Sequence, residues 1–579
     1  MENKIITILL NKLKTTDPTF IIGQLFFIVY FSMALLFYKE RTMSFEGSFF
    51  SFEIIRTNTF YFPLHRFGCG ITQALPLLLL KMTACSLKTF LISYSISLAL
   101  FYYLIFLVIA QVLKDYKVVF VYLLTLCLTY RNTFYFGVSE FSQGLALTVL
   151  LYALLRQIIK HKESKKQILF FIVSILLIFF QYYFHPLTII AILFVLFLTI
   201  IREQLFFDKY FLFLVGFSIV WFGYNMVLKS KVGGYETERM NGFKDFFVST
   251  PSLLNLPSFK YLIKFITGTP LISFGIISVG IIISLIKRKF LLAVLFFFYP
   301  STYIFFIIIA YYKGEAPNMY EQYYIYFGFF AALIFSTFNN NQKNVKYLVL
   351  AVSLLVINIY SMYNAHIIPT KKLSFITNLT NRGLLHEYKK YLITIEDYPY
   401  QIAWSTWAFP LECLLMSSLN NDGNCVAFYV PTNDEEIRFN RKKGKFYFFS
   451  PDYDLNTRDL NKRFFSLPEE TNYITLRRAH DQNYFTQIIN ETDEWKNMLV
   501  EKAKANNTSL TETIKADAKW LADQEFEKEK KIKAIEAEIK KTPIWLENVE
   551  TKSKTLNIPL IEMIRIDAEY IYNTNNNPE

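Results

Sequence analysis

The sequence predicts an α-helical polytopic membrane protein with about eleven transmembrane helices, followed by a water-soluble C-terminal region. Three observations lead to this prediction. Apolar residues make up 53% of the 579 residues, and they form runs of roughly 20, the length of a helix that crosses about 30 Å of hydrocarbon. Lys and Arg gather between alternate runs. After residue 363 the long apolar runs stop, and charged and turn-forming residues become frequent.

The first apolar run follows a polar N-terminus and is long enough to span, so no cleavable signal peptide is expected. The run 71–82 (ITQALPLLLLKM) is short and contains Pro76. We interpret it as an interfacial or re-entrant part of the first loop. The alternative, a true span, would reverse the orientation of everything after it. The predicted spans are 20–38, 88–113, 118–136, 140–159, 168–184, 187–201, 210–228, 267–286, 290–311, 322–338 and 345–363.

The short basic segments fix the orientation. With the N-terminus in the cytoplasm, every dense basic cluster falls on the cytoplasmic side, as the positive-inside rule requires. The long loops 39–87 and 229–266 and the C-terminal region then lie outside, and the expected location is the plasma membrane. The clusters are Lys4/Lys12/Lys14, Lys114/Lys117, Lys160/Lys162/Lys165/Lys166, Arg202/Lys209, Lys287/Arg288/Lys289 and Lys343/Lys346.

The net charge of +13 suggests a nucleic-acid partner until the chain is divided. Residues 1–363 hold 31 Lys and Arg against 15 Asp and Glu, a net charge of +16, whereas residues 364–579 hold 29 against 32, a net charge of −3. The excess belongs to the membrane half, where topology explains much of it. No nucleic-acid partner is expected, and five cysteines are too few for a disulfide framework.

Residues 364–487 are expected to form a small α/β domain outside the cytoplasm. Apolar or aromatic runs at 425–430, 445–449 and 473–477 predict strands, and 403–419 predicts a helix. Cys413 and Cys425 are either a disulfide, which persists in an oxidising compartment, or two buried thiols.

Residues 488–579 contain an internal repeat with an offset of fifty residues. Each copy, 488–522 and 538–572, is expected to be a helical hairpin, and the charged segment 523–541 joins them. Ser509 to Glu512 is a capping box. The repeated Trp495 and Trp545 are expected to anchor the hairpin cores, and a protein partner at 488–579 is the alternative role.

The candidate chemical groups belong to the segments that the topology places outside. Glu46 follows the first span, and Glu140 opens the fourth. Charged groups at membrane depth are costly and are usually paired, solvated or functional. The two carboxylates can act as a general base and as an orienting or metal ligand, or they can simply be solvated by headgroup water. Cationic side chains that can bind a phosphate are Arg56, His65, Arg66, Arg131, His185, Lys231 and Arg239.

This arrangement resembles the GT-C superfamily of integral-membrane glycosyltransferases, which take sugars from polyprenyl-phosphate carriers. The resemblance covers the layout of residues 20–363. Glu46 in FEGSFFS matches the first acidic position, Glu140 in GVSEFSQG matches the second, and Pro63-Leu64-His65-Arg66 matches a His- and Pro-containing segment. The usual adjacent acidic pair is absent, because Gly47 follows Glu46.

The resemblance implies transfer of a sugar from a polyprenyl-phosphate donor to an acceptor outside the cytoplasm, with Glu46 as base and the basic residues holding the leaving phosphate. A divalent metal is possible as cofactor. Two other functions stay open: a non-enzymatic membrane scaffold whose tail binds a partner, and a transporter or polysaccharide polymerase or flippase. Few ionisable residues lie deep within the predicted spans, which disfavours the last.

Overall fold

The structure is a computed structural model that falls into two compact units, residues 1–377 and 378–579. The boundary lies inside a helix that begins at Ile367, beyond the residue 363 that the sequence predicts. The described residues are 17–129, 131–232, 246, 253–266, 271–311, 324–338, 345–384, 389–393, 398, 406–431, 446–450, 454–469, 471, 473–475, 485–486, 489–490, 492–556 and 560–576.

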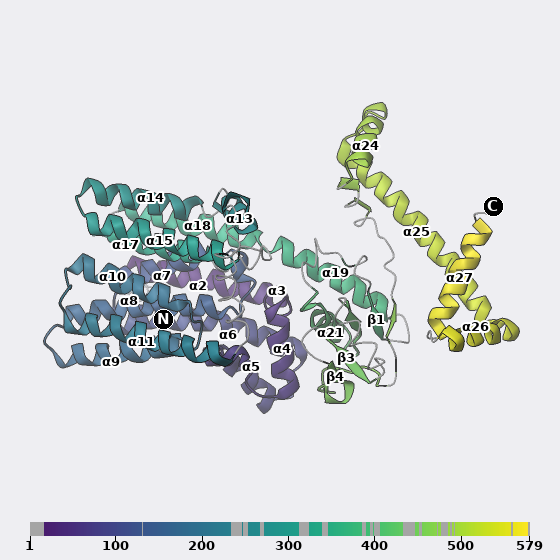
Figure 1. Cartoon of the computed structure of the whole chain (residues 1–579), viewed down its shortest axis with the longest axis horizontal. Coiled ribbons are helices and arrows are strands. Elements are labelled where there is room, and N and C mark those ends of the chain that lie inside the picture. The colour runs from purple at the N-terminus through teal and green to yellow at the C-terminus, as the bar shows by residue number, and fades with distance from the viewer. Residues whose placement is uncertain are drawn as a thin grey trace, which may run out of the picture. The chain divides into compact units, whose positions relative to one another are not determined.

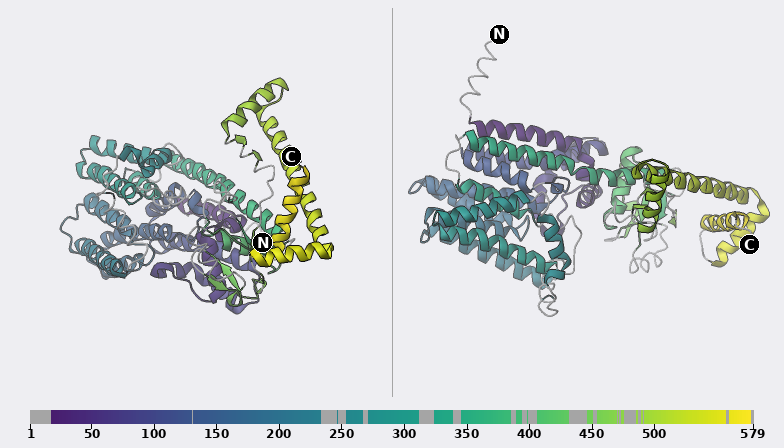
Figure 2. Two further views of the ribbon diagram at one scale, coloured as in Figure 1. Left: turned by 45° about the vertical axis from the view of Figure 1, so that its right-hand side comes forward. Right: turned by 90° about the horizontal axis from the view of Figure 1, so that it is seen from above.

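The first unit is a bundle of helices that run roughly parallel to one another (Figures 1 and 2). Asp17 caps the first of them, with Pro18 at its first position, a combination that favours helix initiation. The described helices are α2 Pro18–Leu36, α3 Tyr38–Thr42, α4 Glu46–Thr57, η1 Pro63–His65, η2 Phe67–Cys69, α5 Gly70–Met82, α6 Leu87–Leu107, η3 Val108–Val112, α7 Tyr116–Thr129, η4 Asn132–Phe134, α8 Glu140–Lys160, α9 Lys165–Gln181, α10 Thr188–Glu203, α11 Lys209–Val232, η5 Leu253–Asn255, α13 Pro257–Ile266, α14 Leu271–Ile286, α15 Phe290–Ala310, α17 Tyr326–Phe338, α18 Val345–Asn364 and α19 Ile367–Leu384.

Six helices of the described chain are long and apolar enough to cross a membrane, or seven if the bent pair α13 and α14 counts as one span. The remaining predicted spans form shorter helices, among them α7 and α17. These two pack against each other, and their described residues are almost all buried. The apolar side chains of α7 and α17 therefore pack mainly against other helices in the interior of the bundle.

The run 71–82 forms α5, a helix of 13 residues that contains Pro76 and packs against α6. About 20 residues are needed to span a bilayer, so α5 is too short to cross one alone.

The two ends of the bundle differ in composition. The turns after η3, α8, α10 and α14 carry the predicted basic clusters 114–117, 160–166, 202–209 and 287–289, and they lie at one end, the left in Figure 1. We call this the basic end. The opposite end holds α3, α4 and α5 with residues 131–139 and 182–187, and we call it the loop end.

The second unit contains a small parallel sheet with strand order β2-β1-β5. Helix α21 packs on β2, and a separate antiparallel pair joins β3 to β4. The predicted strands are present but shorter. The central strand β1 was missed, because it is brief and begins with a lysine, Lys390, that follows another, Lys389. The elements are β1 Lys390–Leu392, α21 Phe409–Asn420, β2 Ala427–Tyr429, β3 Tyr447–Phe449, β4 Asp454–Asn456, η6 Thr457–Asp459 and β5 Ile474–Thr475.

The tail consists of α24 Asp493–Ala505, α25 Leu510–Lys541, α26 Pro543–Leu556 and α27 Leu560–Asn576. The capping box at Ser509 is present. The joining segment 523–541 continues the second helix of the first copy, so α25 is one helix of 32 residues. Each copy contains the same ion pair at the equivalent position. Lys502 bonds Asp517 at 2.5 Å in the first copy, and Lys552 bonds Asp567 at 2.8 Å in the second.

Candidate functional site at the loop end

Arg41 is a deeply buried cation of the loop end, with 1% of its surface exposed. It lies on α3, directly after the first apolar helix. Its Nε donates to Ser95 Oγ at 2.9 Å, and its Nη1 donates to the Phe134 carbonyl at 2.8 Å. The guanidinium also lies 4.1 Å from the centre of the Phe134 ring, a cation–π contact. Arg41 thus joins the loop between α2 and α6 to α6 and to the segment 131–139.

The remaining nitrogen of Arg41, Nη2, is buried and has no hydrogen-bond partner within the described residues. A Cβ placed on Gly137 would lie 3.2 Å from this nitrogen, so the absence of a side chain at residue 137 leaves room beside it. A buried donor without a partner is costly. Such a group is a reason to look for a ligand.

Helix α19 brings further charged contacts to the loop end. Thr370 donates to the carboxylate of Glu40 at 2.8 Å. Lys372 is 1% exposed, and its Nζ lies 3.6 Å from the centre of the Phe45 ring. Phe45 immediately precedes Glu46 and contacts Phe136 at 5.3 Å between ring centres. Glu46 is therefore adjacent in sequence to a residue that contacts both α19 and the segment 131–139.

Arg66 and Glu140 form an ion pair at 3.2 Å, and their side chains are only 13% and 12% exposed. Glu140 occupies the first position of α8, where the helix dipole favours a negative charge. The contact joins the loop between α2 and α6 to the first residue of α8. An Arg at a phosphate site can exchange one anion for another, because its fork of donors fits both carboxylate and phosphate.

The backbone around Arg66 is held from several sides. The Cys69 thiol donates to the Arg66 carbonyl at 2.7 Å, and burial raises the pKa of this thiol, with a further rise from the Glu140 carboxylate. The Gln73 amide bonds both the N–H and the carbonyl of Tyr61, at 2.8 and 2.7 Å. The Gly68 N–H donates to the Tyr183 carbonyl at 3.1 Å. These bonds aim Arg66 at the start of α8.

Gln143 and Tyr94 are among the buried side chains of this region that have polar atoms without partners in the described chain. Gln143, one turn after Glu140, is fully buried, and both of its amide atoms lack a hydrogen-bond partner. The hydroxyl of Tyr94 is also buried and has no hydrogen-bond partner in the described chain. It lies near Cys69 and Glu140. Groups of this kind are satisfied when a polar ligand enters. We call Arg41, Arg66, Tyr94, Glu140 and Gln143 the loop-end cluster.

The other predicted site residues take different places. Glu46 is half-buried at the first position of α4. Arg56 forms a two-bond pair with Glu53, at 2.7 and 3.1 Å, which ties it to its own helix. Arg131 is exposed. His65 is exposed and, like Leu64, has a positive φ, 57° and 53° respectively, a strained backbone for both residue types.

His185 has a structural role at the start of α10. Its Nδ1 accepts from the Leu187 N–H at 3.1 Å, and its ring packs edge-on against Phe141 at 4.7 Å. The side chain therefore lies against the residue that follows Glu140.

Two of the predicted site residues fall outside the described part of the chain. These are Arg239 and the side chain of Lys231. Cys413 and Cys425, in the second unit, are both present as buried thiols rather than a disulfide, and burial raises the pKa of Cys425 to about 12.

The described residues do not fit a metal centre. No three His, Cys, Asp or Glu side chains among them lie close enough to share an ion. Glu140, one of the two proposed ligands, has a cation as its partner. We therefore assign no step to a metal.

Sequence reasoning missed Arg41, Lys372 and Gln143. Arg41 stands beside Glu40 and Lys39, which suggests a solvated charge cluster rather than a buried group. Lys372 was assigned to the C-terminal domain. The available signal was the position of Arg41 directly after an apolar helix, since a charge there is either at the interface or inside the bundle.

No protein-family model, curated protein or solved structure matches this chain. The site is therefore interpreted from its own chemistry. It offers buried guanidinium groups, the start of a long helix and two carboxylates, Glu46 and Glu140, at one end of an apolar bundle.

Proposed function

We propose that the protein is a membrane glycosyltransferase that moves a sugar from a polyprenyl-phosphate carrier to an acceptor at the loop end. In this proposal the eleven predicted segments cross the plasma membrane, the N-terminus is cytoplasmic, and the loop end and the C-terminal region face outside. The carrier's chain lies along the apolar bundle, which puts its phosphate at the height of the loop-end cluster.

The observation that carries the proposal is the Arg66–Glu140 pair, with the unpaired atoms of Gln143 and Tyr94 close to Glu140 in sequence or space. A sugar phosphate needs cations for its leaving group and amide or hydroxyl groups for its hydroxyls. The cluster supplies both, and the Arg66 and Glu140 side chains are largely buried. Arg41 adds a second buried guanidinium from the same loop.

The proposed reaction has one displacement step. Glu46 accepts the proton of the acceptor hydroxyl while the hydroxyl oxygen attacks the anomeric carbon of the sugar. The bond from that carbon to the phosphate oxygen breaks, and its electron pair leaves with the carrier phosphate. Arg66, released from Glu140 when the phosphate binds, stabilises the developing charge.

The test compares Glu46→Gln and Glu140→Gln with the matched control Glu163→Gln, an exposed carboxylate in the turn at the basic end. Each variant must be folded and present at normal abundance. Loss of a general base typically lowers the rate about 100-fold or more. We expect a missing surface glycan and accumulated lipid-linked sugar in the first two variants and a normal profile in the control. Normal glycans in both site variants would contradict the proposal.

A second candidate, a membrane scaffold, is favoured by one observation in the tail. Trp520 and Tyr570 occupy equivalent positions in the two copies, and they are 61% and 70% exposed. Trp495 and Trp545, by contrast, pack against the hairpin cores. Exposed aromatic residues at repeated positions are suited to a protein partner.

The scaffold is tested with Trp520→Ala and Tyr570→Ala. As a scaffold the protein should keep its fold but lose its cellular phenotype in this double variant, whereas the transferase should keep its glycan product. Trp545→Ala is the comparison variant, because removing a packed residue lowers stability instead.

A further inference from the structure

A second polar site lies at the opposite, basic end of the bundle. It is a pocket of about 460 Å³ between the turn that precedes α7, the last turns of α8 and the end of α10. Its volume falls within the usual range of small-molecule sites, roughly 300–1,000 Å³. The charged residues that line it are Lys114, Asp115, Lys117, Arg156, Lys160 and Glu203.

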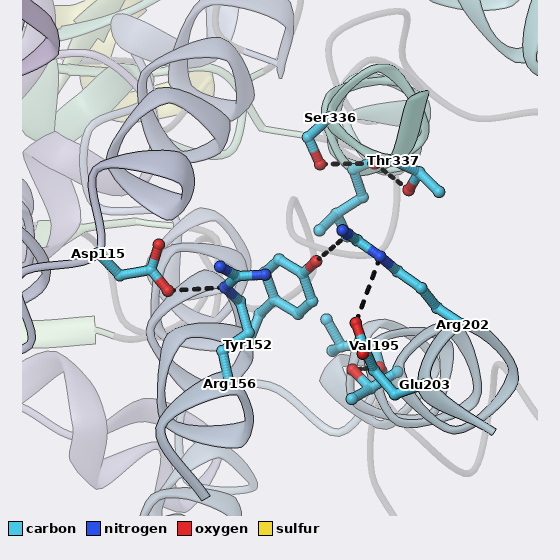
Figure 3. Close-up of polar contacts among 10 residues, drawn as sticks. Asp115, Tyr152, Arg156, Val195, Arg202, Glu203, Ser336 and Thr337 are labelled. Atoms are coloured by element: carbon cyan, nitrogen blue, oxygen red, sulfur yellow. Dashed lines mark hydrogen bonds and ion pairs between the residues drawn. The ribbon is translucent and has the colours of Figure 1, made fainter. Parts of the chain in front are cut away.

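Both carboxylates of the pocket are already paired with guanidinium groups. Asp115 Oδ2 bonds Arg156 Nε at 2.6 Å, and its other oxygen caps α7 by accepting from the Val118 N–H. Glu203 bonds Arg202 Nε at 3.4 Å, and Arg202 also donates to the Tyr152 hydroxyl at 3.3 Å. Figure 3 shows the contacts of Asp115 with Arg156 and of Arg202 with Tyr152 and Glu203. The acidic residues thus shape the pocket without neutralising its other cations.

Three lysines remain. Within the described chain, Lys114, Lys117 and Lys160 have no carboxylate within ion-pair distance. They come from two different helical segments that the pocket brings together. The wall is rigid, because the buried Gln157 amide donates to the Leu113 carbonyl at 3.0 Å and so closes the end of the preceding helix.

The position of the pocket indicates where its ligand comes from. In the turn between α10 and α11, beside Glu203, Phe206 and Phe207 are 42% and 95% exposed. Exposed Phe side chains next to basic residues are suited to the boundary between headgroups and acyl chains. Basic pockets between membrane helices at this depth bind phosphate headgroups.

We propose that this pocket binds the phosphate headgroup of an anionic membrane lipid through Lys114, Lys117 and Lys160. The binding does not rest on the proposed transferase activity, since the pocket and the loop-end cluster lie at opposite ends of α8. A lipid headgroup and free inorganic phosphate both carry an anionic phosphate group that the three lysines could bind. We propose that the lipid is the ligand.

The test uses the full-length protein in nanodiscs of phosphatidylcholine that contain a minor fraction of phosphatidylglycerol, with native mass spectrometry to count retained lipids. The pocket variant carries Lys114→Gln, Lys117→Gln and Lys160→Gln. The control carries Lys162→Gln, Lys165→Gln and Lys166→Gln, which remove the same charge from exposed positions of the adjacent turn outside the pocket. A further variant carries Lys114→Arg, Lys117→Arg and Lys160→Arg. It keeps the positive charge, so it distinguishes an effect of lost charge from an effect of misfolding.

We expect retention of phosphatidylglycerol to fall roughly tenfold or more in the pocket variant and to persist in the control and in the arginine version. An equal fall in pocket and control variants would overturn the proposal, because general surface charge would then explain the binding. Unchanged retention in the pocket variant would also overturn it. A further arm adds inorganic phosphate. Lysine-dependent displacement of the lipid by millimolar phosphate would overturn the lipid as the source, and no displacement would support it.

Discussion

Arg41 shows how a single buried cation can organise a loop. Its side chain bonds α6 and the segment 131–139 and stacks on Phe134, so it ties three parts of the chain together. Burying a charge is unfavourable unless hydrogen bonds and neighbouring dipoles replace water. Arg41 has two hydrogen bonds and an aromatic face, but its Nη2 has no hydrogen-bond partner in the described chain. A ligand with an acceptor group would supply that missing bond.

Arg41→Lys is expected to lower the melting temperature of the purified protein. Lysine has a single ammonium group and cannot reproduce the planar fork that meets Ser95 and Phe134 together. The loss corresponds to about 1–3 kcal/mol. The measurement is thermal unfolding in detergent, with the exposed Arg131→Lys as control. Equal melting temperatures for both variants would show that the Arg41 contacts contribute little.

Lys390 provides a prediction of pH dependence in the second unit. Burial lowers the pKa of this lysine to about 8, while Glu469 opposes the shift and Lys462 adds to it. Between about pH 8 and the ordinary lysine value of 10.5, the unfolded chain therefore binds a proton that the folded chain has released. Stability consequently rises with pH in this window.

The test is the melting temperature of the full-length protein and of Lys390→Met from pH 7 to 9.5. Methionine removes the titration, so the stability of the variant relative to the wild type should decrease as the pH rises. Burial also raises the pKa of Tyr391 to about 12, but this tyrosine is present in both proteins, so its effect cancels in the comparison. A difference that is independent of pH would contradict the assigned shift.

At the scale of elements, α8 links the two polar sites. It begins with Glu140 in its first turn and ends with Lys160 in its last. Both placements complement the helix dipole. The same helix therefore contributes an acidic residue to the loop-end cluster and a basic residue to the pocket at the basic end. The middle of the helix is buried in the bundle.

The docking of the loop between α2 and α6 onto the turn between α9 and α10 depends on Gly68. A Cβ at this position would lie 2.5 Å from the ring of Phe184, which is buried and cannot move aside freely. Gly68→Ala should therefore displace the loop, lower the melting temperature and weaken the Arg66–Glu140 pair two residues away.

Gly216→Ala on α11 is the matched control, because no atom lies within 4 Å of the added Cβ. Alanine favours a helix over glycine by roughly 1 kcal/mol, so this variant should be as stable as the wild type or slightly more stable. Thermal unfolding of both variants decides the matter. If Gly68→Ala were as stable as Gly216→Ala, the close approach to Phe184 would not hold the loop.

At the scale of the whole molecule, the orientation of the bundle decides which site meets which compartment. The proposal places the loop end outside and the basic end in the cytoplasm. His65→Cys and Lys162→Cys put a thiol on an exposed position at each end. The five native cysteines are all buried, so they give little background.

We expect an impermeant thiol reagent to label His65→Cys in intact cells and to label Lys162→Cys only after the membrane is broken. If α5 were a true span, only the chain after it would reverse, and both cysteines would be labelled in intact cells. The reverse pattern would show the opposite orientation of the whole bundle. It would place the pocket of the basic end in the outer leaflet. It would also place the loop-end cluster in the cytoplasm, which would contradict transfer to an acceptor outside the cell.

Local patterns in the sequence allowed much of this architecture to be predicted. Apolar runs locate the helices of the bundle because burial of apolar surface depends on composition over a short stretch. The capping box at Ser509 was predictable for the same reason, since its two partners are three residues apart. The strand β1 was not, because a short strand is defined by its neighbours in the sheet rather than by its own residues.

By itself, the sequence determined that the chain is rich in membrane-type helices, that basic residues gather in alternate turns and that the tail repeats. Only the tertiary structure decided that Arg66 faces Glu140, that Arg41 and Lys372 are buried, and that Lys114, Lys117 and Lys160 share a pocket. The physical reason is range. Helix formation and capping depend on residues a few positions apart, whereas an ion pair 74 residues apart in sequence depends on how distant segments pack.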